Sequence, residues 1–76
     1  MDSLTGRITR LIDDQQLGTI AAEDGVDYLF DSHSLLGTTF AMLHVGAPVT
    51  FVPNAATRRA GVVRITVPSF AKQKPL

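Results

Sequence analysis

The sequence predicts an all-β fold, a small closed barrel of five short antiparallel strands. Three observations support this prediction. No window of about a dozen residues places apolar side chains at the i, i+3, i+4, i+7 spacing of an amphipathic helix. Short β-branched runs instead recur between turn signals. The expected strands divide into three and two around a longer connection, and closing such a sheet into a barrel removes its exposed edges.

The first two strands are expected over residues 4–12, LTGRITRLI, and 17–22, LGTIAA. A polar cluster over residues 13–16 separates them. The second strand ends at EDG, where Gly25 can adopt the positive φ of a tight turn. Together with the strand that follows, these two strands are expected to form a meander.

The third strand is expected over residues 26–31, VDYLFD, in which apolar and acidic side chains alternate. A looser segment follows, SHSLLGTTFAMLHVGA. Ser32 or Ser34 can cap one short helical turn there, and Gly37 can end it. This segment is the connection between the two parts of the sheet.

The last two strands are expected over residues 48–53 and 60–67. Pro48 and Pro53 stand at the ends of the fourth strand, where a missing N–H costs least. The loop between these strands presents Arg58 and Arg59. We expect one domain over residues 1–68 and a flexible tail over 69–76, because two prolines interrupt that tail.

Composition narrows the class of protein. The chain has 76 residues and no cysteine, so we expect neither disulfides nor a thiolate metal site. No apolar run approaches the roughly 20 residues of a membrane span, and the N-terminus lacks the order of a secretory signal. We therefore expect a cytoplasmic monomer without membrane contact.

The charges are divided unevenly along the chain, although seven basic and seven acidic residues give zero net charge. All the acids lie within residues 1–31, and from residue 32 onward the charged residues are all basic. This division either creates a dipolar surface that steers a polyanion or, as we favour in a small barrel whose halves interleave, places solvated charges at loop tips.

Catalysis is not expected. His33 and His44 are the only histidines, and their spacing does not place two ligands on one face. Asp31 and Ser34 flank His33, but Ser-His-Asp chemistry needs a cleft and an oxyanion site that so small a barrel seldom offers. We therefore expect no enzyme activity, no metal and no cofactor.

Three segments carry a resemblance to a known family. Residues 6–20, GRITRLIDDQQLGTI, follow the pattern G-T-V-K-W-F-N-x-x-K-G-F-G-F-I without a gap. YLFDSHSLL follows L-F-V-H-F-S-A-I, and FAMLHVGAPVTF follows G-F-K-x-L-x-x-G-x-x-V-x-F. On these residues the chain resembles the cold-shock domain over roughly residues 4–67. The resemblance implies an OB-type barrel that binds single-stranded RNA or DNA on the outer face of its first three strands.

The binding positions of that family mostly differ here. Its aromatic platform falls on Arg10, Leu11, Leu17 and Thr19, and two of its lysines fall on Thr9 and Gln15. Base-aromatic stacking is worth about 1–3 kcal/mol per base, so this loss implies a weaker and more electrostatic binder. The positions expected to bind nucleic acid are Arg10, Leu17, Phe30, His33, Phe40, Arg58 and Arg59.

These positions have different expected roles. Arg10, Phe30, His33 and Phe40 would stack on bases, while Arg58 and Arg59 would contact phosphates. Two alternatives stay open: Phe30 is either exposed, as we favour, or in the core, and Phe40 either stacks or closes the end of the barrel. A second hypothesis gives the outer face to a protein partner, through the aliphatic face of Leu11, Leu17 and Thr19.

Asp31 occupies a position where the family has an inward valine, and an unpaired carboxylate inside a barrel is costly. Either the third strand ends at Phe30 and Asp31 caps the following turn, or the local register differs. We favour the cap because Ser32 and Ser34 continue the polar run.

Overall fold

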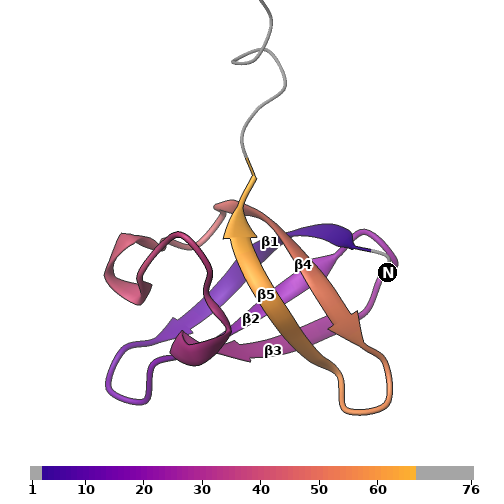
Figure 1. Ribbon diagram of the computed structural model, residues 1–76, viewed down its shortest axis with the longest axis horizontal. Coiled ribbons are helices and arrows are strands. Elements are labelled where there is room, and N and C mark those ends of the chain that lie inside the picture. The colour runs from indigo at the N-terminus through magenta and orange to yellow at the C-terminus, as the bar shows by residue number, and fades with distance from the viewer. Residues whose placement is uncertain (1–2, 67–76) are drawn as a thin grey trace, which may run out of the picture.

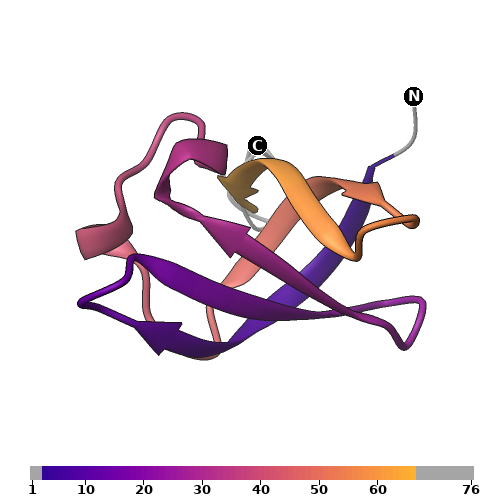
Figure 2. The ribbon, with the colours of Figure 1, turned by 90° about the horizontal axis from the view of Figure 1, so that it is seen from below.

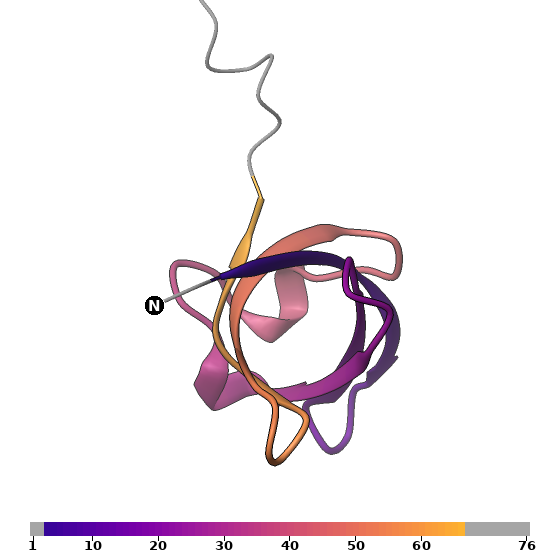
Figure 3. The ribbon, with the colours of Figure 1, turned by 90° about the vertical axis from the view of Figure 1, so that its right-hand side faces the viewer.

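The computed structural model describes residues 3–66, which form a closed barrel of five strands. The strands are β1 (Leu4–Ile12), β2 (Leu17–Ala22), β3 (Asp27–Asp31), β4 (Pro48–Asn54) and β5 (Arg59–Ile65). They pair in the order β1-β2-β3-β5-β4, and β4 pairs with β1 to complete the ring seen in Figure 3. The predicted closed five-stranded barrel is confirmed, and its strand order is consistent with an OB-type fold.

The prediction that every strand pair is antiparallel is wrong at one place. The β3 and β5 strands run in the same direction where they meet, pairing Leu29 with Arg59, and Leu35 forms a second parallel bridge to Val63. The cause is the connection over residues 32–47, which separates β3 from the β4–β5 hairpin and lets β5 return alongside β3 (Figure 1).

The strand ends differ slightly from the prediction. The expected third strand began at residue 26, but the Val26 amide donates to Asp24 Oδ1 (3.0 Å) and belongs to the preceding turn. The fourth strand extends one residue further, to Asn54, and the fifth starts at Arg59 and ends at Ile65. The predicted end of the fifth strand at residue 67 and the predicted tail over 69–76 lie outside the described residues.

The connection contains two short 3-10 turns, η1 (Ser32–Ser34) and η2 (Phe40–Met42). The turn expected near residue 32 is present, and of the predicted caps Asp31, rather than Ser32 or Ser34, is its N-cap; the turn ends at Ser34, before the expected Gly37. The η1 turn lies beside β5, and the Leu36 amide just after it donates to the Val63 carbonyl oxygen at 2.8 Å (Figure 2). The connection therefore completes the barrel wall where β3 and β5 share few bonds.

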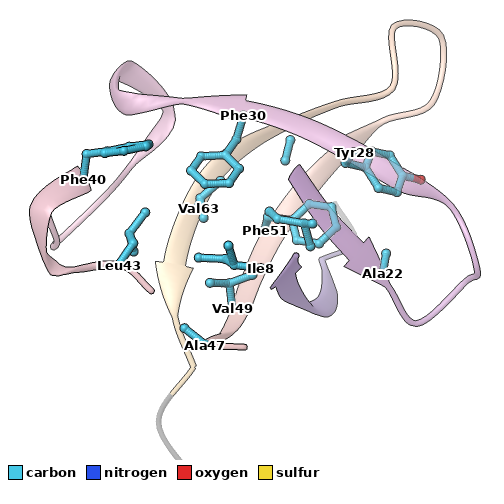
Figure 4. Close-up of a cluster of buried hydrophobic side chains, with 12 residues drawn as sticks. Ile8, Ala22, Tyr28, Phe30, Phe40, Leu43, Ala47, Val49, Phe51 and Val63 are labelled. Carbon is cyan, nitrogen blue, oxygen red and sulfur yellow. The ribbon is translucent and has the colours of Figure 1, made fainter. Parts of the chain in front are cut away.

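Inward side chains from all five strands fill the barrel (Figure 4). The largest that are fully buried are Phe30, Phe51, Ile8, Ile20, Val49 and Val63. At one end Phe40 packs against Phe30, with ring centroids 6.4 Å apart, and Leu43 lies beside it. The core thus takes its aromatic rings from β3, β4 and the connection.

Candidate nucleic-acid interface

A β-bulge in β1 decides which of its side chains face outward. Ile8 pairs with Ile20 inside the barrel, and the register then shifts, so that the next pair is Arg10 with Thr19. A bulge inserts one extra residue and reverses the alternation beyond it. Arg10 is therefore exposed, whereas Leu11 pairs with Gly18 and packs against the core. The expectation that Leu11 contributes to an outer aliphatic face is wrong for this reason.

One row of paired residues crosses four strands on the outer face. Arg10 on β1 pairs with Thr19 on β2, Thr19 pairs with Leu29 on β3, and Leu29 pairs with Arg59 on β5. We call these four residues the central row. Because neighbouring strands are about 4.8 Å apart, its two arginines stand roughly 14 Å from each other along the sheet.

Two further rows flank the central row. The row nearer the β1–β2 turn consists of Ile12, Leu17 and Asp31. The row on the other side consists of Arg7, Ala21 and Asp27. Arg7 and Ala21 also line a groove of about 470 Å³ along β1. The face therefore mixes arginines, aspartates and half-buried aliphatic side chains.

Asp31 is fixed by three groups. Its Oδ1 atom accepts a hydrogen bond from the His33 amide (3.0 Å) and one from the Ser34 hydroxyl (3.3 Å). Its Oδ2 atom lies 3.2 Å from Nη2 of Arg59. The predicted capping role of Asp31 is confirmed, although Asp31 is itself the last residue of β3. The carboxylate lies outside the barrel because Asp31 is two residues after Leu29 on β3, and both side chains point to the outer face.

The expectation that Phe30 is exposed is wrong. Its side chain is fully buried, and it pairs with Gly18, whose missing side chain leaves room for the ring. A Cβ atom on Gly18 would lie 2.6 Å from two ring carbons of Phe30. The signal was present in the sequence: Asp27 and Asp31 share a phase that suits solvent, which leaves the opposite phase to Tyr28 and Phe30.

Phe40 is also buried and its ring packs against Phe30, which favours the alternative in which it closes the barrel end over the one in which it stacks on a base. Each phenylalanine and tyrosine within residues 3–66 belongs to the core: Tyr28, Phe30, Phe40 and Phe51. The part of the chain that the structure describes therefore offers no platform of phenylalanine or tyrosine rings.

The other predicted positions lie on or beside the face. The His33 side chain is 95% exposed just after β3, so its ring is accessible. Leu17 is half-buried between Ile12 and Asp31. Arg58 is exposed in the β4–β5 turn, and its carbonyl oxygen accepts from the Leu29 amide (2.9 Å), which holds this turn against β3. The structure thus places Arg59 in the central row and Arg58 directly beside it.

The chain matches no protein-family model, and no curated protein matches it. The resemblance to the cold-shock domain therefore stays a prediction based on the quoted residues. Across residues 3–66, the acidic and histidine side chains do not gather in any group of three that could hold a metal ion. In the same range, no helix has the length and apolar character needed to cross a membrane.

Proposed function

We propose that this protein binds single-stranded nucleic acid weakly and chiefly by charge, as a divergent cold-shock-like domain, on the outer face of β1–β3. The central row is the observation that carries the proposal, because it places an arginine at each side of the sheet with Thr19 and Leu29 between them. Arg58 stands beside this row. Guanidinium groups bind phosphates and also stack on bases, which suits sequence-independent contact with a strand.

Weak affinity follows from what the face contains. Stacking of bases on aromatic side chains contributes strongly to the affinity for single strands. The phenylalanine and tyrosine rings of the described residues are inside the barrel and do not provide it. The exposed ring of His33 is the side chain that can still stack on a base in this way. Asp27 and Asp31 further lower the positive potential of the face. On the central row and directly beside it, Arg59 is paired with Asp31, whereas Arg10 and Arg58 form no ion pair within residues 3–66, so these two are the arginines that we expect to contact phosphates.

The proposal is tested by titrating fluorescein-labelled hexathymidine and a mixed-sequence RNA oligonucleotide at two salt concentrations. With two phosphate contacts, the slope of log K against log salt is about −1.4, so a fourfold rise in salt weakens binding about sevenfold. Arg10→Gln and Arg58→Gln each reduce this slope by about 0.7. The matched control is Arg64→Gln, an exposed arginine of β5 that pairs with Thr50 away from this face.

Two results contradict the proposal. One is the absence of binding at high micromolar protein in low salt. The other is an equal loss of affinity in the Arg64→Gln control and in Arg10→Gln, which would indicate non-specific charge attraction. Arg10→Trp serves as a gain-of-function variant, because an indole at this outward position adds a stacking surface and tightens binding.

A protein partner is the second candidate function, and one observation favours it. Ile12, Leu17 and Leu29 are half-buried aliphatic side chains on the outer face, with Arg10 and Asp31 beside them. An apolar centre with a polar rim is typical of protein interfaces. Amide chemical-shift mapping separates the candidates. A partner or a second copy shifts Leu17 and Leu29 without nucleic acid, whereas the oligonucleotide shifts Arg10 and Arg58.

A further inference from the structure

The two carboxylate oxygens of Asp31 contact different parts of the protein. Oδ1 is held by the His33 amide and the Ser34 hydroxyl, both belonging to η1, so the carboxylate has a fixed position at the end of β3. Oδ2 faces β5 and accepts a hydrogen bond from Nη2 of Arg59 at 3.2 Å. The Asp31 side chain is 28% exposed and that of Arg59 is 47% exposed, so the pair lies at the surface where a bound strand would pass.

A carboxylate and a phosphate compete for the same donor. Arginine binds both through the same N–H groups, so an arginine engaged by a carboxylate has fewer donors left for a phosphate. A fixed negative charge also repels an approaching polyanion. Both effects act at one end of the central row, at Arg59.

We propose that Asp31 is an intramolecular competitor of the nucleic acid: it occupies Arg59 and thereby limits the number of phosphates that the face contacts. This inference rests on the proposed function and adds to it the group that regulates its strength. Asp31 acts through Arg59 and is a positioning residue. The face then contacts phosphates through Arg10 and Arg58, and Arg59 becomes a third phosphate contact only when it is released from Asp31.

Asp31→Asn is the informative variant, because asparagine caps helical turns as well as aspartate does. The amide oxygen can still accept from the His33 amide and the Ser34 hydroxyl, while the charge is gone. Asp27→Asn is the matched control: Asp27 lies on the same strand and the same face, and within residues 3–66 it forms no ion pair. Circular dichroism should show that both variants are folded.

Labelled hexathymidine is the probe. Asp31→Asn is expected to tighten binding about two- to fivefold, the range of one surface ion pair, and Asp27→Asn less. The salt slope should steepen from about −1.4 to about −2.1 as a third contact forms, but only in Asp31→Asn. Adding Arg59→Gln should then weaken binding at least about threefold more in the Asp31→Asn protein than in the wild type.

The outcomes separate the inference from the proposed function. Binding by the wild type, with Asp31→Asn no tighter than Asp27→Asn, overturns the inference alone. Equal effects of Arg59→Gln in the two backgrounds do the same. Absence of binding by the wild type and by both asparagine variants refutes the proposed function and, with it, the inference.

Discussion

Adding one methyl group to Gly18 tests the placement of Phe30. A Cβ atom there would lie 2.6 Å from two ring carbons of Phe30 and 2.9 Å from the Arg10 carbonyl oxygen. The oxygen belongs to the β1 backbone, and the ring is enclosed by the core, so neither can easily give way. Overpacking of this kind costs about 1–3 kcal/mol. For a domain of this size, each kcal/mol lowers the melting temperature by roughly 4–8 °C.

Gly61→Ala is the matched control for Gly18→Ala. A Cβ atom on Gly61 meets its nearest neighbour, the Val52 carbonyl oxygen, at 3.8 Å, an ordinary contact. Urea unfolding followed by circular dichroism should therefore show a loss of about 1–3 kcal/mol for Gly18→Ala and a change within about 0.5 kcal/mol for Gly61→Ala. Combining Gly18→Ala with Phe30→Leu should recover part of the loss, since the smaller side chain frees space.

Equal stability of the two alanine variants would refute this reasoning. It would mean that the Phe30 ring does not lie over Gly18, and the exposed position expected from the family resemblance would have to be reconsidered. Additivity in the double variant would point to the same conclusion, because residues that do not touch do not couple.

Three further predictions concern Phe30, Tyr28 and Asp31. Phe30→Leu should cost about 1–2 kcal/mol in urea unfolding yet leave the affinity for hexathymidine unchanged, because the ring is inside the barrel. Burial, together with the 2.9 Å hydrogen bond to Asp24, raises the pKa of Tyr28. Because the folded state holds the Tyr28 proton more tightly, the contribution of Tyr28 to stability should be constant below about pH 10, its ordinary pKa, and fall as the pH rises through the folded value. Tyr28→Phe should remove this fall, and the ultraviolet titration of the single tyrosine reports the pKa directly. Asp31→Ala removes both the cap and the Arg59 contact and should cost about 1 kcal/mol, whereas Asp31→Asn should cost less; thermal melts compare them.

The barrel could be predicted because its signals are local. Turn residues such as Gly25 divide the chain into five β-branched runs, and the polar residues that follow Phe30 indicate a cap. The direction of β5 relative to β3 could not be predicted in this way. It depends on how the connection crosses the barrel end, and no residue near Leu29 or Arg59 encodes it.

The candidate face was harder to predict. Alternation divides the side chains of a strand into two sets, but it does not determine which set points into the barrel. One extra residue at Thr9 reverses the alternation in β1, so Leu11 turns inward although the family resemblance places it outside. In β3 the resemblance put Phe30 outside, whereas the core takes it together with Tyr28. The exposure of the arginines was easier to predict, because Arg10 and Arg58 carry a charge and therefore reach solvent whichever way the neighbouring side chains point.

The sparse pairing between β3 and β5 has a consequence for motion. Within residues 3–66, Leu29 and Arg59 are the one registered residue pair between these strands, and the Leu29 amide donates to the Arg58 carbonyl oxygen while, beyond the strands, the Leu36 amide donates to that of Val63. A boundary with few bonds opens at lower free energy than the rest of a fold, so these two amides should exchange with deuterium earlier than those between β1 and β2. A strand lying across Leu29 and Arg58 would join both sides of this boundary. Ligand binding should then appear as slower exchange at Leu29, even where no atom of the ligand touches that amide.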